Sequence, residues 1–145
     1  MIDFRYQKQL NRHDPENGKW GDCFPTVLAC LMNIDRKEVP HFFDQGNEDY
    51  SVVYDWMAER RVRLIKVIFE GDRDTVIESV SYLNPGVRWI LSGKSSIGAQ
   101  HVVICKDGKI EHDPSQINSG IVGPGDDGFF WVEFLVPLMD HEDES

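Results

Sequence analysis

Hydrophobic residues in the first part of the chain recur at the spacing of an α-helix. Between residues 27 and 32 the apolar side chains fall three or four positions apart, and Pro25 suits the first turn of a helix. We therefore predict a helix from Phe24 to about Asn33. Polar turn formers fill residues 11–22, which we predict to be a loop. Similar spacing predicts one short helix and two longer ones further along: residues 35–39, 48–60 and 74–83.

The later part of the chain alternates apolar and polar positions or carries short β-branched runs, which is the pattern of strands. The segments that show it are residues 63–69, 87–91, 101–105, 109–113 and 129–136. Successive strands joined by short turns favour antiparallel pairing. The sequence therefore predicts an α+β fold in which N-terminal helices pack on a C-terminal, mostly antiparallel sheet.

Length and charge limit the domain organisation and the partners. A chain of 145 residues without a repeat or a linker predicts a single domain over residues 1–139, followed by an acidic, disordered tail over residues 140–145. The net charge of −10 offers no counterion release, so we expect no nucleic-acid partner. The chain has no apolar run near the roughly 20 residues of a membrane helix. Its N-terminus is polar, so we expect a cytoplasmic protein with no membrane partner.

The three cysteines differ in their surroundings, and their spacing fits neither a redox pair nor a zinc finger. Cys30 and Cys105 lie within apolar runs and are expected in the core. Cys23 instead follows a turn that contains Gly21 and opens the predicted helix. A helix N-terminus and a nearby histidine favour the thiolate form of a cysteine, and free amides there can stabilise an oxyanion. Cys23 is therefore a candidate nucleophile; the alternative is a small residue at a helix end that Asp22 caps.

A candidate base and a candidate orienting carboxylate lie on one predicted hairpin. His101 begins its first strand, Asp113 ends its second, and the turn falls at residues 106–108. A three-residue loop with Gly108 in the left-handed conformation sets residue 101 directly opposite residue 113, where an imidazole N–H can reach a carboxylate. A two-residue loop would turn the pair to opposite faces, so the catalytic interpretation requires the longer loop. A lone histidine at a strand start is otherwise more often structural.

The order Cys23, His101, Asp113 is that of papain-type enzymes, whose catalytic residues adjoin in space and not in sequence. We predict Cys23 as the nucleophile, His101 as the general base and Asp113 as the residue that orients the ring. An alternative for the same side chains is a zinc site, but structural zinc sites usually carry a local CxxC pair, which this chain lacks. We therefore expect no metal and no cofactor.

Two segments, GDCFPTVLACLMNIDRKEVPHF and SGKSSIGAQHVVICKDGKIEHDP, resemble a family of small proteins from phage and bacterial genomes. That family is similar to papain-like cysteine peptidases, in the broad group that includes the peptidase domains of bacteriocin-exporting transporters. The resemblance spans residues 21–114. It implies a papain-like fold, a protein or peptide substrate, and triad roles for Cys23, His101 and Asp113, with His112 on the far face of its strand.

The resemblance is incomplete at the oxyanion site. Papain-like enzymes usually place a glutamine shortly upstream of the cysteine, but the residue six positions before Cys23 is Asn17. The nearest glutamines, Gln7 and Gln9, can donate an amide N–H there by folding back across the loop. All three side chains are candidates for the oxyanion donor, and Asn17 is otherwise a plain turn former.

The walls of the cleft are expected from segments that adjoin the nucleophile and the base. Trp20 lies in the turn before Cys23, although an aromatic residue is by default part of the core. Ser95 and Ser96 lie in the loop before His101. That loop contains Gly-Lys-Ser but lacks the spacing of a phosphate-binding loop, so we predict it to be a cleft wall.

Three functions are compatible with these residues. The first is hydrolysis of an amide or isopeptide bond through an acyl-enzyme. The second is acyl or amine transfer on the same triad, as in transglutaminases, where an amine replaces water. The third is a non-catalytic binding module on a papain-like frame, because a fold does not name a reaction. A cysteine-directed electrophile separates the third from the others, and product analysis with added amine separates the first two.

Overall fold

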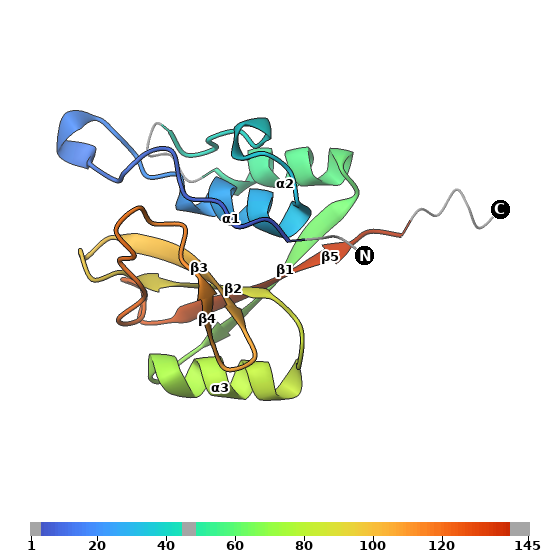
Figure 1. The fold of residues 1–145 in the computed structure, drawn as a ribbon, viewed down its shortest axis with the longest axis vertical. Helices are drawn as coiled ribbons and strands as arrows, with labels where there is room; N and C mark the ends of the chain where they lie inside the picture. Colours follow the sequence, from blue (N-terminus) through green and yellow to red (C-terminus); the bar gives the residue numbers. More distant parts are fainter. Residues whose placement is uncertain (1–3, 45–48, 140–145) are drawn as a thin grey trace.

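An antiparallel sheet runs through the middle of the computed structural model, which describes residues 4–44 and 49–139 (Figure 1). Its strands are β1 (Val62–Phe69), β2 (Trp89–Lys94), β3 (Gln100–Lys106), β4 (Lys109–His112) and β5 (Phe130–Pro137). The helices are α1 (Cys23–Met32), α2 (Tyr50–Glu59) and α3 (Arg73–Leu83), with short 3-10 helices η1 (Pro15–Asn17) and η2 (Arg36–Glu38). The predicted α+β class is confirmed. The predicted tail at residues 140–145, and residue 48 at the start of a predicted helix, lie outside the described residues.

The helices begin and end where the local sequence favours it. α1 begins at Cys23 and ends before Asn33, which is left-handed at φ 56° and donates its N–H to carbonyls of the last turn. η2 is enclosed by a capping box, in which Asp35 caps the helix and Glu38 bonds back to the amide of Asp35. None of the helices in the two described ranges combines the length and the apolarity needed to cross a membrane.

Helices cover both faces of the sheet (Figure 1). α1 and α2 cover one face, where Leu28, Met57 and Ile90 belong to one buried cluster. α3 covers the other face, where Val80 and Trp89 belong to a second buried cluster. The predicted packing of N-terminal helices on the sheet therefore holds for α1 and α2, while α3 forms the opposite layer.

The strand order β1-β5-β2-β3-β4 explains the position of α3. β5 lies between β1 and β2 and is antiparallel to both, so β1 and β2 are parallel to each other. Parallel strands require a crossover connection, and α3 is that crossover. The sequence pattern predicted the strands but not the insertion of β5 into the centre of the sheet.

The β3–β4 hairpin differs from its prediction. Its loop has two residues, Asp107 and Gly108, both with positive φ, instead of three. The pairing register then shifts by one, so that Glu111 is an extra residue and His112 pairs with Ile104. The predicted three-residue loop was wrong. The bulge at Glu111 nevertheless returns residues 101 and 113 to the same face of the sheet, as the longer loop would have done.

Candidate active site

Cys23 is the first residue of α1 and is partly exposed. The first backbone hydrogen bond of the helix is donated by Thr26 to the carbonyl four residues back, and Pro25 has no N–H. The amides of Cys23 and Phe24 are therefore those left at the helix end beside the thiol. A cavity of about 260 Å³ opens there, and Cys23, Phe24 and His101 are among the residues that line it. The structure thus places the candidate nucleophile at a helix start in a cleft.

A buried ion pair holds the residue that precedes the cysteine. Asp22 is completely buried, and its carboxylate accepts the amides of Leu10 at 3.1 Å and Asn11 at 2.8 Å. Arg36, 5% exposed, donates its Nε to Asp22 at 2.7 Å. Asp22 occupies the N-cap position of α1, but its side chain makes no capping bond, so it does not cap the helix in the way that the sequence offered as an alternative. It instead ties the preceding loop and η2 to the start of α1.

His101 and Asp113 are joined by a direct hydrogen bond. His101 is 6% exposed, and its Nε2 lies 2.7 Å from Oδ1 of Asp113. The carboxylate also accepts the amides of Ser115 at 2.9 Å and Gly120 at 2.7 Å. Burial alone would raise the pKa of Asp113, but these hydrogen bonds and the charge of His101 outweigh burial and lower it. Asp113 is therefore an acceptor-only carboxylate with a fixed orientation.

The bulge at Glu111 explains how the pair forms on a two-residue loop. A two-residue loop without a bulge would turn residues 101 and 113 to opposite faces. With the extra residue, His112 pairs with Ile104. If this pairing is extended by one residue, Asp113 lies opposite Val103. Val103 shares a face with His101, because side chains alternate along a strand.

His101 also interacts with Cys23. Burial alone would lower the pKa of His101, but hydrogen bonds to Asp113 and Cys23 and the charges of both raise it to about 9. Because Asp113 engages Nε2, Nδ1 is the ring nitrogen that remains for the sulfur. At neutral pH the ring is therefore an imidazolium between a carboxylate and a cysteine sulfur.

Gln9 is the oxyanion candidate that the structure brings to the cysteine. It is 7% exposed and lines a small cavity of about 40 Å³ together with Cys23 and His101. Its Nε2 donates to the carbonyl of Asn11 at 2.6 Å, and a primary amide has a second N–H to donate. A Cβ on Gly21 would lie in ordinary contact with this nitrogen at 3.4 Å but only 3.0 Å from the Cβ of His13, so the glycine chiefly makes room for His13.

Gln7 and Asn17, the other oxyanion candidates, are not brought to the site. Gln7 donates to the carbonyl of Ile34 and accepts the amide of Arg36, both at 2.8 Å, so its side chain links the N-terminal segment to η2. Asn17 lies in η1 and donates to Asp14 at 2.7 Å, as a turn former does. Neither residue lines the two cavities beside the cysteine.

The cleft walls include Trp20 in the larger cavity and Ser95 in the smaller one. The prediction that Ser96 forms part of the cleft wall is wrong, because Ser96 is exposed and lines neither cavity. Its amide instead donates to the carbonyl of Ser119 at 3.1 Å. Ile97 of the same loop lines the smaller cavity. The loop is thus a wall through residues on either side of Ser96.

The residues of the larger cavity that the sequence did not predict include two ionisable ones, His13 and Glu133. His13 accepts the amide of Gly21 at its Nδ1, 3.1 Å away, and its ring centroid lies 5.5 Å from that of Trp20. His13 stands in a polar loop and Glu133 in a mostly apolar strand, so neither carries a local signal. Only the tertiary fold brings them to Cys23.

His112 lies outside the site, since its Nε2 bonds to the carbonyl of Gln7 and its ring packs 5.4 Å from that of Tyr6. This agrees with its expected place on the far face of the strand. Among the residues that the structure describes, no three histidine, cysteine or acidic side chains are grouped as a metal site requires. Comparison of the chain with protein-family models, with curated proteins and with solved structures finds no match.

Proposed function

We propose that this protein is a cysteine hydrolase that cleaves an amide or isopeptide bond through an acyl-enzyme on Cys23. The observation that carries the proposal is the buried His101–Asp113 hydrogen bond, with Cys23 as the second partner of the ring. A nucleophile beside a base that a third group orients is the arrangement of nucleophilic catalysis. Burial raises the pKa of Cys30 to about 11 and that of Cys105 further, so neither thiol competes.

Acylation follows from the positions of the groups at the helix end. The Cys23 sulfur attacks the substrate carbonyl carbon, a C–S bond forms, and an electron pair moves to the carbonyl oxygen. The backbone amide of Cys23 and Nε2 of Gln9 donate to that oxyanion. The C–N bond then breaks, and His101 gives its Nδ1 proton to the leaving nitrogen, which departs as an amine. A thioester remains on Cys23.

Deacylation uses the same groups in reverse. Water attacks the thioester carbonyl while the neutral His101 accepts a proton from it at Nδ1. The C–S bond breaks with its electron pair on the sulfur, the carboxylic acid leaves, and the proton that His101 accepted remains between the ring and Cys23. Asp113 holds the Nε2–H through both steps, which keeps the ring oriented and stabilises its charged form.

A papain-like frame is part of the proposal. It is supported by a helix that begins with the nucleophile and packs on β3, the strand that carries the base. The order of Cys23, His101 and Asp113 along the chain supports it too. We further propose that the enzyme acts in the cytoplasm, where its free thiols stay reduced.

Selective alkylation tests the nucleophile. Native protein is treated with iodoacetamide at about pH 6.5, and the modified cysteines are mapped by mass spectrometry. Cys23 should react at least about tenfold faster than Cys30 or Cys105, and His101→Ala should slow it. Equal, slow reaction of all three thiols would overturn the assignment.

Cleavage itself is tested on a peptide library prepared from a whole proteome. The wild type should create new carboxyl termini, whereas Cys23→Ala and His101→Ala should not. His112→Gln is the matched histidine control, because it lies outside the site and can still donate to the Gln7 carbonyl. Amidated products that appear only with added amine would show a transferase instead.

A further inference from the structure

Glu133 is a buried carboxyl group in the wall of the active-site cavity. It lies on β5, is 4% exposed, and lines the 260 Å³ cavity together with Cys23 and His101. Its Oε2 is buried without a hydrogen-bond partner among the described residues. Burial raises the pKa of Glu133, although the charge of Lys66 opposes this. A buried carboxyl oxygen without a donor is costly, so its place beside a nucleophile needs an explanation.

Lys66 is a cationic residue on the neighbouring strand β1, but it forms no ion pair with this carboxylate. The two residues are register partners on β1 and β5. The Nζ of Lys66 instead lies 3.9 Å from the ring centroid of Tyr50 and 5.2 Å from that of Tyr54. Among the described residues no ion pair joins Lys66 to Glu133. The two aromatic faces therefore hold the ammonium group, and the carboxylate is left facing the cavity.

The cavity continues from Glu133 into a wider groove of about 560 Å³. Glu133 lines both spaces, and the groove adds Asp126 and Asp127, which are exposed. Asp126 pairs with Lys94 and Asp127 accepts the indole N–H of Trp131 at 2.7 Å. The lining carries more acidic than basic side chains, and the whole chain has a net charge of −10. Lys66 is the basic side chain of this lining, against three acidic ones, and a cleft in which one sign of charge predominates concentrates ligands of the other sign.

We propose that Glu133 is a specificity residue that binds the cationic side chain of a lysine or arginine next to the scissile bond of a peptide substrate. This rests on the proposed hydrolase activity of Cys23. The ammonium or guanidinium group donates to the unpartnered Oε2 and forms a charge-assisted hydrogen bond. The apolar stem of the same side chain packs against Phe24, Phe43 and Tyr50, which line the same cavity as Cys23 and Glu133. Acidic side chains are rejected at this position, because their charge would lie beside a buried carboxylate.

Two chloromethyl ketones that differ in one amino group test the proposal. One carries an acyl-lysine and the other an acyl-norleucine, which has the same carbon stem without the amine. Both alkylate the same sulfur, so the ratio of their rates at Cys23 reports the binding of the amino group. The wild type should react at least about tenfold faster with the lysine probe, as expected for a charge-assisted hydrogen bond gained in a buried site.

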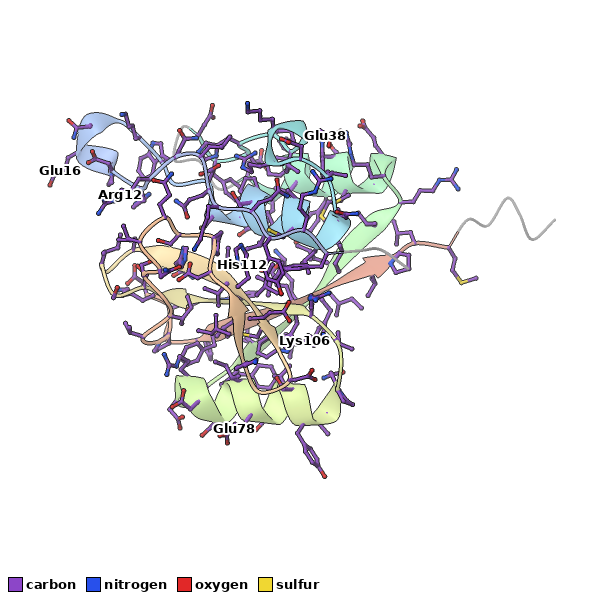
Figure 2. All side chains as sticks on the ribbon, in the orientation of Figure 1. Arg12, Glu16, Glu38, Glu78, Lys106 and His112 are labelled. Atoms are coloured by element: carbon purple, nitrogen blue, oxygen red, sulfur yellow. The ribbon has the colours of Figure 1, made fainter. Side chains whose placement is uncertain are left out.

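Glu133→Gln removes the charge and keeps the shape, so the ratio should fall to about one. The matched control is Glu78→Gln, the same substitution on the exposed surface of α3, on the opposite face of the sheet from α1 (Figure 2). Glu78→Gln should keep the wild-type ratio. Glu133→Asp retains a carboxylate and should keep part of the preference, which covers the case that the glutamine variant does not fold.

The outcomes separate this inference from the proposed function. Equal rates with the two probes in the wild type, or a lysine preference that survives in Glu133→Gln, would overturn the role of Glu133. Either result leaves the hydrolase proposal standing if iodoacetamide still selects Cys23. Loss of that selectivity in the wild type would instead refute the nucleophile assignment, and it is measured without any Glu133 variant.

Discussion

Single residues in this site are held by several partners at once. Asp113 accepts three N–H groups, and His101 lies between that carboxylate and the Cys23 sulfur. A substitution therefore changes both the orientation of the ring and its charge. The two effects are separable, because the oxygen atoms that accept hydrogen bonds set the orientation of the ring, whereas the pKa of the imidazole sets its charge.

Replacement of Asp113 by asparagine keeps one oxygen for the ring but removes the charge. Its NH₂ group would then face an amide donor, at a cost of about 1–3 kcal/mol in the free energy of unfolding. The pKa of His101 should fall below about 9, because a neutral amide favours the imidazolium less. Turnover should decrease by less than in His101→Ala. An NMR titration of the ring and cleavage rates check this; equal, total loss in both variants at normal melting temperature would contradict it.

The raised pKa of His101 also predicts how stability and activity depend on pH. An unfolded histidine titrates near 6.5, so the folded state favours the protonated ring. This stabilisation is complete below about pH 6.5 and is lost as the pH rises through about 9. Cleavage should decline over the same upper range, because the leaving amine takes its proton from the imidazolium. Melting curves and kcat/KM in a pH series measure both, and His101→Gln is the control whose melting curves should lack the transition.

At the scale of elements, local chemistry predicted the helix of Cys23 but not the register of the hairpin. A proline in the first turn and an asparagine that tolerates the left-handed conformation mark the ends of α1. The bulge at Glu111 has no such signal, because a glutamate in a polar–apolar alternation looks like any strand residue. The pairing of His101 with Asp113 was predicted for a loop that the chain does not have.

The close approach between β2 and the segment after Asp113 gives a test of this arrangement. Gly93 pairs with His101, and a Cβ at Gly93 would lie 2.5 Å from the carbonyl oxygen of Gly123. Gly93→Ala should therefore cost about 1–3 kcal/mol in the free energy of unfolding. It should also slow cleavage, because the displaced segment includes Gly120, a donor to Asp113.

Gly123→Ala is the control for this substitution. A Cβ there meets no atom within 4 Å, and its φ is not in the left-handed region. Urea unfolding and cleavage rates should stay near those of the wild type. If Gly93→Ala behaves like Gly123→Ala in both measurements, the contact does not support the site.

At the scale of the whole molecule, the ion pair between Asp22 and Arg36 joins three segments. Arg36→Met would leave the Asp22 carboxylate buried without its cation, at a cost of about 3–5 kcal/mol in the free energy of unfolding. The start of α1 should loosen with it, and alkylation of Cys23 should slow. Urea unfolding and iodoacetamide rates measure the two effects.

The comparison is Glu59→Gln, which breaks an exposed pair with Arg60 that is 3.7 Å long. Exposed pairs contribute little, so this variant should unfold near the wild-type urea concentration. A similar small effect of Arg36→Met would show that the buried pair does not anchor the nucleophile.

The sequence pattern did not predict which segments far apart in the chain come together in the fold. Periodicity predicts that residues 129–136 form a strand but not which strands it joins, since pairing partners are set by packing across the whole chain. Glu133 became recognisable as a cleft residue only once β5 was placed beside β2. Gln9 was one of three oxyanion candidates until the fold brought it, and not Gln7 or Asn17, to the cysteine.

The central place of β5 has a consequence for how the protein is made. β1 and β2 do not pair with each other, because β5 lies between them, and β5 is the last of the described strands in the sequence. On the ribosome, the earlier strands must wait for residues 130–137 before the sheet can close, and such long-range closure is slow. Glu133 belongs to β5, so it joins the cavity wall only when this strand pairs. We therefore expect Cys23 and Glu133 to share one cavity only after residues 130–137 have joined the sheet, which makes the cavity one of the last features of the fold to form.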